Sequence, residues 1–278
     1  MKQNLILTLI SSVLILTACS QSGNGNSTAK KGRIKLTTCS GYEAAEKKGE
    51  SPKDTLTTKA TFQYDENGNM IAAKYYDLKT NLVFSSDKRT YDDRGNMVEI
   101  LHYNKAGEVI GKDIFKFDDK NHEIEKDNYW EGKLNGKVIS IYDYKSMVVT
   151  VSFYKGDGSF ERKNHYKIDD KGNHLEDYDW AGTLISKSRY EYDDKGKIIK
   201  EYSESWDMDT TNDKIVYEYD IQNNEIIRTI TDLNTNTVSN VKTEYTYDKF
   251  DNWIKQVTTW SWSDSRKTVK REIEYYEE

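Results

Sequence analysis

Stretches in which aromatic or β-branched residues alternate with polar residues recur along most of the chain. In one of them Tyr245 and Tyr247 flank Thr246. A second apolar run follows after a short polar turn, as at Met97–Tyr103. Alternation with a period of two is typical of a strand with one buried face, and no segment has a helical period. The pattern therefore predicts pairs of strands, in which one face of the first strand is largely aromatic.

The turn inside each pair has a recurring sequence, for example TYDDRGNM at 90–97 and EYDDKGKI at 191–198. Its first aspartate after the aromatic position, here called the anchor, returns every 24 to 28 residues. The eight anchors are Asp65, Asp92, Asp118, Asp143, Asp169, Asp193, Asp220 and Asp248, of which Asp143 is recognised mainly by its spacing. A period this regular indicates a repeat architecture.

Turn chemistry accounts for the repeated sequence. Three residues after seven of the anchors stand Gly68, Gly95, Asn121, Gly172, Gly196, Asn223 and Asp251, which are residue types that adopt a positive φ most readily. Such a residue closes a four-residue hairpin turn, and the anchor carboxylate can accept backbone N–H groups within it. A calcium loop is the alternative, but the bidentate glutamate at position twelve of an EF-hand loop is absent. We therefore expect structural turns and no metal.

The units TYDDRGNMVEILHY, KIDDKGNHLEDYDW and EYDDKGKIIKEYSE resemble the YD repeats of the rearrangement-hotspot (RHS) family and of smaller bacterial lipoproteins. The resemblance covers Lys59–Trp262. It implies a curled β-sheet, and the small lipoprotein members are often described as sugar-binding. The large members enclose a toxin, and this chain has no trailing segment that resembles one.

We predict an all-β fold, an antiparallel meander of about eight hairpin repeats that forms a long, twisted and curved sheet. Residues 33–278 would form this single domain. Within it, residues 33–56 would be an N-terminal cap and Val269–Glu278 a charged edge strand.

The N-terminus has the pattern of a secretion signal at residues 1–18, with Lys2 followed by an apolar stretch. It ends in Leu16-Thr17-Ala18-Cys19, which resembles the lipobox of bacterial lipoproteins. By that resemblance Cys19 would carry lipid and anchor the protein in a membrane. Ser20 stands where an inner-membrane retention signal would have Asp, which favours the outer membrane, and the lack of acidic residues just after Cys19 favours the periplasmic side over the cell surface. Residues 19–32 read as a flexible tether, and Cys39 would be left as a lone, buried thiol.

Composition narrows the chemistry further. Without the signal the chain has 40 basic and 47 acidic residues, spread evenly, which argues against a nucleic-acid partner. The four histidines form no zinc motif and no pair with Cys39, and no glycine-rich phosphate loop is present, so we expect no cofactor, metal or catalytic set. Glu99, Glu176 and Glu201 lie in second strands, where a carboxylate pair could serve a glycosidase.

One aromatic feature is not explained by the turns. An aromatic residue 11 to 13 positions after most anchors predicts a row of rings near the second turn, comprising Tyr76, Tyr103, Trp130, Tyr154, Trp180, Trp206 and Trp260. Such a row could cover the core or could bind sugar rings or a partner chain. We expect a non-enzymatic binding or scaffold module whose ligand is a carbohydrate or an envelope protein. The alternative is an envelope glycan hydrolase with two carboxylates about 5–9 Å apart.

Overall fold

All regular structure in the described part of the chain is β-strand. The computed structural model describes residues 32–45, 53–179, 181–206 and 211–277. The strands are β1 (Ile34–Ala45), β2 (Thr55–Tyr64), β3 (Met70–Tyr76), β4 (Val83–Tyr91), β5 (Met97–Asn104), β6 (Val109–Phe117), β7 (Glu123–Trp130), β8 (Lys133–Asp143), β9 (Val148–Lys155), β10 (Phe160–Ile168), β11 (His174–Tyr178), β12 (Leu184–Tyr192), β13 (Ile198–Ser205), β14 (Thr211–Tyr219), β15 (Glu225–Asp232), β16 (Thr237–Tyr247), β17 (Trp253–Trp260) and β18 (Ser263–Tyr275). No helix in these residues is long and apolar enough to cross a membrane.

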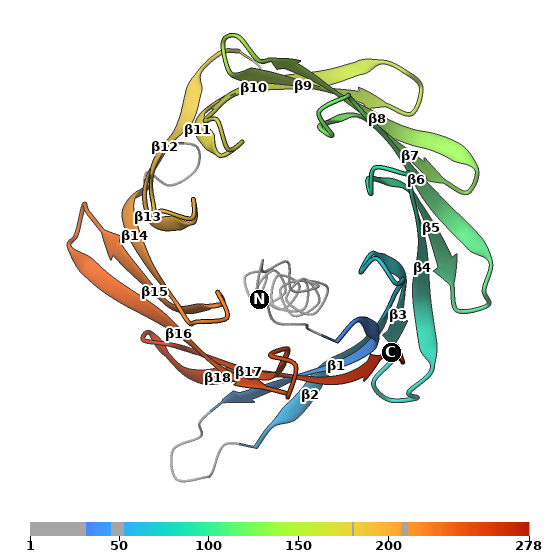
Figure 1. The fold of residues 1–278 in the computed structure, drawn as a ribbon. Coiled ribbons are helices and arrows are strands. Elements are labelled where there is room, and N and C mark those ends of the chain that lie inside the picture. The colour runs from blue at the N-terminus through green and yellow to red at the C-terminus, as the bar shows by residue number, and fades with distance from the viewer. Residues whose placement is uncertain (1–31, 46–52, 180, 207–210, 278) are drawn as a thin grey trace.

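The strands form one antiparallel meander that closes on itself. Each strand pairs with the next, and β1 pairs with both β18 and β2, so the 18-stranded sheet is a ring (Figure 1). The prediction of an antiparallel meander is confirmed, but the predicted long, twisted and curved sheet closes on itself. Twist curls a sheet of this many strands. Closure then satisfies the backbone groups that two free edges would expose.

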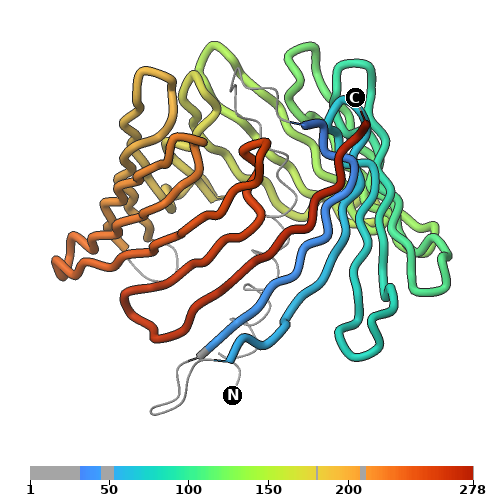
Figure 2. The backbone as a smooth tube through the Cα atoms, turned by 60° about the horizontal axis from the view of Figure 1, so that its bottom comes forward, coloured from blue at the N-terminus to red at the C-terminus, as the bar shows by residue number. Residues whose placement is uncertain are grey.

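The closing strand comes from the stretch expected to be a cap. In β1, Thr37 lies opposite Ile273 of β18 and Phe62 of β2, and Figure 2 shows β1 between these two strands. The expected edge strand at the C-terminus lies mostly within β18, which has a partner on each side, β17 and β1. The prediction of a free edge there is therefore wrong.

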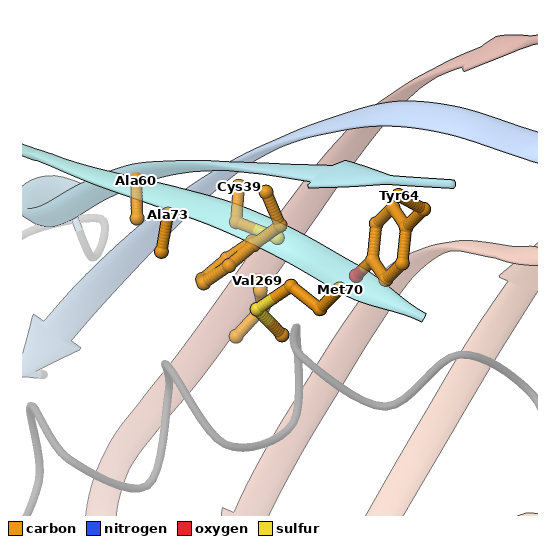
Figure 3. Packing of buried hydrophobic residues seen from close by; sticks show 7 residues of the cluster. Cys39, Ala60, Tyr64, Met70, Ala73 and Val269 are labelled. Atoms are coloured by element: carbon orange, nitrogen blue, oxygen red, sulfur yellow. The ribbon is translucent and has the colours of Figure 1, made fainter. Parts of the chain in front are cut away.

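The best-buried side chains lie on one face of the sheet at this closure. Cys39 is opposite Ala60, and Phe62 is opposite Ala73. Together with Tyr64, Met70 and Val269 they form a hydrophobic cluster (Figure 3). Closing a sheet crowds the side chains on its concave face, so we identify this face as the inner wall. Cys39 is 1% exposed and the described residues include no free cysteine, so the predicted lone thiol is wrong.

The opposite, outer face carries charged side chains in cross-strand pairs. Lys116 of β6 and Lys137 of β8 both contact Glu125 of β7, at 2.8 and 2.9 Å. Lys167 contacts Glu176 at 2.6 Å across β10 and β11. Exposed ion pairs of this kind add little to the free energy of folding. Their charged groups make this a face that is solvated by water.

The anchor turns all lie at one end of the ring, here called the anchor rim, and curl toward its inside (Figure 1). The residue three after the anchor has a positive φ in Gly68, Gly95, Asn121, Gly172, Gly196, Asn223 and Asp251, with values from 59° to 86°. The Oδ1 of Asp169 accepts the backbone N–H groups of Lys171 and Asn173, at 2.9 and 2.8 Å. The anchor carboxylate therefore organises its own turn.

The tyrosine before the anchor has a second role, which is to join neighbouring repeats. The Tyr247 hydroxyl donates to the anchor Asp220 of the preceding repeat and accepts a bond of 2.7 Å from the Asn224 side chain. The same arrangement joins Tyr192 to Asp169 and, at the end of β18, Tyr275 to Asp248, whereas Tyr144, which bonds to Asp118, follows its anchor. The hydroxyls of Tyr91 and Tyr219 donate instead to backbone carbonyls of the preceding repeat. In the Asp92 repeat the corresponding position is Phe117, which has no hydroxyl. The turn sequence therefore specifies contacts around the ring as well as a hairpin.

Loss of one of these hydroxyls should destabilise the ring. Tyr247→Phe leaves a carboxylate oxygen of Asp220 and the amide of Asn224 without this partner, so we expect a loss of about 1–3 kcal/mol in the free energy of unfolding. Denaturant unfolding measures it. Tyr202→Phe is the control, because Tyr202 packs against Arg189 on the outer face and its hydroxyl makes no hydrogen bond within the described residues. Equal stability of the two variants would refute the role of the hydroxyl.

Acid should weaken the anchor turns. Burial raises the pKa of Asp118, but hydrogen bonds from Tyr144 and from the backbone of His122 and Lys120 outweigh it and lower the pKa to about 2. A pKa below the unfolded value of about 3.9 means that the stabilisation is present above that pH and is lost as the pH falls toward 2. We expect unfolding curves of Asp118→Asn to depend less on pH in this window than those of Asp119→Asn. Identical pH dependence would contradict this account.

Candidate functional site

The predicted row of aromatic residues lies at the rim opposite the anchor turns, here called the second rim. Tyr76, Trp130 and Trp260 end β3, β7 and β17, and Tyr103 and Tyr154 stand one residue before the ends of β5 and β9. Trp206 directly follows β13 and is 42% exposed. Trp180, like Cys19 and the tether, lies outside the described residues.

These rings do not form one continuous surface. Strand register places Tyr76, Tyr103 and Tyr154 on the outer face. By the same alternation, Trp130 and Trp260 belong to the inner wall. The only ring contact of this set within the described residues joins Tyr154 to Phe160 at 5.8 Å. Bulges near the second turns change which face the last residue of each strand occupies. Equal spacing in sequence therefore did not give equal placement.

The three glutamates singled out from the sequence do not come together. Glu99 and Glu176 lie on the outer face, and Glu176 is paired with Lys167. Glu201 lies on the inner wall and accepts a hydrogen bond of 2.8 Å from Tyr217. No carboxylate pair forms among them.

The inner wall carries a polar cluster that the sequence did not reveal. The His102 ring of β5 contacts Asp87 of β4 through Nδ1 at 2.9 Å and Asp113 of β6 through Nε2 at 3.6 Å. Lys126 lies 3.3 Å from Asp113, and Asn128 donates to Asp113 at 2.6 Å. Asp113 is only 7% exposed, and its burial is balanced by these partners.

Glycine at position 111 makes room for this cluster. A Cβ there would lie 3.1 Å from the Trp130 ring and 3.4 Å from the His102 ring. His102 and Gly111 are directly opposite each other on β5 and β6, so a Cβ at position 111 would touch the imidazole and would crowd the Trp130 ring and the Tyr129 carbonyl. The need for glycine here comes from neighbours on other strands.

Every carboxylate oxygen of the cluster has a donor. Asp87 contacts His102 through Oδ1 and accepts the Tyr75 hydroxyl through Oδ2 at 3.2 Å. Burial, with Asp87 as the next cause, raises the pKa of Tyr75 to about 12, which keeps its hydroxyl protonated. A glycosidase acid needs a carboxyl group that is free to give its proton to a substrate. The cluster is better suited to holding side chains in place at the border of a binding surface.

Two adjoining hollows lie beside this cluster and share Phe153. The first has a volume of about 390 Å³ and includes Lys126, Asn128, Gly136, Val138 and Phe153 in its lining. The second has a volume of about 330 Å³ and includes Val151, Phe153, Asn164, Tyr166, His174 and Asp177. Phe153 is directly opposite Val138, Val138 is opposite Lys126, and Lys126 is opposite the buried Phe115. Residues directly opposite each other share a face, so the Phe153 side chain lies on the inner wall. The pair is called the Phe153 hollows below.

Aromatic and hydrogen-bonding groups alternate within the second hollow. The His174 ring stacks on Tyr166 with 4.1 Å between centroids, and its Nδ1 lies 2.8 Å from Asp177. Asp177 also accepts the Ser186 hydroxyl at 2.5 Å. Apolar faces beside fixed polar groups suit a ligand that has both kinds of surface.

The sequence contained a signal for the hollows that the repeat analysis did not use. Val149, Val151 and Phe153 alternate with polar residues in β9, which follows the irregular Asp143 repeat. This alternation predicts an inward face, but it does not say which strands lie beside it. No group of three or more histidine, cysteine or acidic residues in the described ranges could hold a metal ion.

No protein-family model and no curated protein matches the chain. Among solved structures, a porin-like protein from Bacteroides uniformis aligns with 90% of this chain and 100% of its own, at a TM-score of 0.43 and 10% identity. TcdB2-TccC3 aligns with 78% of this chain and 14% of its own, at a TM-score of 0.37 and 10% identity. An outer membrane lipoprotein-sorting protein domain from Vibrio parahaemolyticus aligns over 88% and 87%, at a TM-score of 0.24 and 9% identity. These are likenesses only, and they assign no activity to this chain.

Proposed function

We propose that this chain is a lipid-anchored, non-enzymatic protein of the cell envelope, built from YD repeats, that binds a carbohydrate at the Phe153 hollows. The lipobox-like sequence Leu16–Cys19 supports the location in the cell envelope. The repeated turn sequence supports the resemblance to the YD-repeat family. Attachment at the outer membrane, with the ring on the periplasmic side, follows from the same sequence pattern.

The observation that carries the ligand class is the composition of the hollows. Phe153 and Tyr166 offer ring faces, and Asn164 and Asp177 offer hydrogen-bonding groups beside them. A sugar has apolar C–H faces and a rim of hydroxyls, so it matches this alternation. The two volumes, about 390 and 330 Å³, are at the small end of the range typical of ligand sites and would hold one or a few sugar units.

A second candidate, a glycan hydrolase, is favoured by one carboxylate pair elsewhere on the inner wall. Asp213 of β14 lies directly opposite Asp232 of β15. Burial, and then Asp232, raises the pKa of Asp213, whereas hydrogen bonds from Thr235 and Asn234 lower the pKa of Asp232. Opposed shifts of this kind distinguish an acid from a base in glycosidases. Asp232 also caps its own turn, which explains its position without catalysis, so we rank binding first.

Removal of the shared ring should weaken carbohydrate binding. A sugar identified on a glycan array should bind Phe153→Ala about 1–3 kcal/mol more weakly than the unaltered protein, measured by calorimetry. The control is Phe160→Ala, since Phe160 is 56% exposed and does not line either hollow. Equal binding by both variants would place the ligand elsewhere. Cleavage of the sugar, abolished in Asp213→Asn, would instead establish the hydrolase.

The anchor is tested at Cys19. Cys19→Ser should abolish incorporation of labelled fatty acid, because the lipid would be attached to that residue. Labelling that persists in Cys19→Ser would overturn the anchor.

A further inference from the structure

Four lysines of the outer face lie against tyrosine rings in consecutive hairpins. The Lys270 ammonium lies 4.8 Å from the Tyr42 ring centroid, and Lys59 lies 5.2 Å from Tyr76. The pattern continues around the ring with Lys88 and Tyr103 at 5.6 Å, and with Lys112 and Tyr129 at 5.2 Å. These eight residues, on β18 and β1 to β7, are called the lysine–tyrosine strip.

Register brings further positive charge to the strip. Lys270 is directly opposite Lys255 on one side and opposite Ser40 on the other, and Ser40 is opposite Lys59. Lys88 and Lys112 are both opposite Leu101. Lysines that face each other across strands repel, so this arrangement lowers stability unless something else offsets the charge.

In the part of the chain that the structure describes, none of the four lysines of the strip has an acidic partner, whereas several other lysines of the outer face do. Lys116, Lys137, Lys167 and Lys200 each lie within 3.0 Å of a glutamate oxygen. Among the described residues, by contrast, no carboxylate lies within 4.0 Å of the ammonium groups of Lys59, Lys88, Lys112 or Lys270. Glu99 and Glu272 share this face but stand closer to the anchor rim.

The chain as a whole is acidic, with a net charge of −6. The anchors and other aspartates concentrate negative charge in the turns at the rims, which leaves the wall between them basic on this side. The even spread of charge along the sequence therefore becomes uneven on the folded surface. Such a surface attracts anions and binds them where a lysine ammonium group has no carboxylate beside it.

We propose that the lysine–tyrosine strip binds a linear acidic polysaccharide bearing carboxylates. Paired units repeat every second strand, which is roughly 10 Å around the ring and close to the length of a disaccharide. Each lysine would contact an acidic group, while the neighbouring tyrosine packs against a sugar face. A flat bilayer could touch only part of a strip that follows a curved wall, whereas a flexible chain can follow it throughout. This site is separate from the Phe153 hollows, whose linings include none of the eight residues of the strip.

The test uses polygalacturonate as the probe, with dextran as the neutral polymer, and the full-length protein. The strip variant carries Lys59→Gln, Lys88→Gln, Lys112→Gln and Lys270→Gln. The control variant carries Lys116→Gln, Lys137→Gln, Lys167→Gln and Lys200→Gln, which removes the same charge from paired lysines of the same face. We expect the strip variant to bind polygalacturonate about tenfold or more weakly, since each exposed charge contact contributes a few-fold. Dextran should not bind, and added salt should weaken the complex.

Several outcomes would overturn the proposal. These are equal weakening in both variants, binding of dextran as strong as that of polygalacturonate, or binding to vesicles with anionic lipid but not to polygalacturonate. The corresponding Lys→Arg strip variant keeps the charge, so it should retain binding and shows whether a loss came from misfolding. Phe153→Ala should leave polygalacturonate binding unchanged. A wrong assignment of the strip can therefore be distinguished from a wrong assignment of the Phe153 hollows.

Discussion

Backbone pairing of β1 with both β18 and β2 is the contact on which the rest of the structure depends. Without it the meander would end in two edges, each with a row of unpaired N–H and C=O groups. The hydrophobic cluster of Cys39, Phe62 and Val269 lies across this seam, so side-chain burial is concentrated where the two ends of the sheet meet. Closure also creates the distinction between an inner and an outer wall.

That distinction gives the two faces different chemistry. The inner wall combines tyrosines, the His102 cluster and the Phe153 hollows, and its buried Asp113 is paired with Lys126. The outer wall is charged and in contact with water, with lysine–glutamate pairs over part of the ring and, within the described ranges, lysines without an acidic partner over another part. Because strand residues alternate strictly, one stretch of sequence contributes to both surfaces. The two proposed binding sites share only β7, where Lys126 and Asn128 line the first hollow and Tyr129 belongs to the strip.

The tyrosine of each repeat links local structure to the ring. Within a hairpin the anchor aspartate binds backbone N–H groups, and in several repeats its second oxygen accepts a hydroxyl from the following repeat. Where Phe117 lacks the hydroxyl, Arg94 donates to the Asp118 carbonyl and Asn96 donates to the Asn121 side chain instead. Contacts of this kind couple only neighbouring units, as in other repeat proteins.

The sequence by itself determined the strands, their antiparallel order and the turns, because alternation and turn chemistry are local properties. It predicted which positions would need a positive φ, such as Gly95, and that one strand face would be aromatic. It could not show that β1 closes the ring, because that pairing joins residues more than 200 positions apart. The His102 cluster, the hollows and the lysine–tyrosine strip also required the tertiary structure. Each of these sites depends on which strands become neighbours and on bulges that change the face on which a side chain lies. The sequence of a single repeat specifies neither the neighbouring strands nor the bulges.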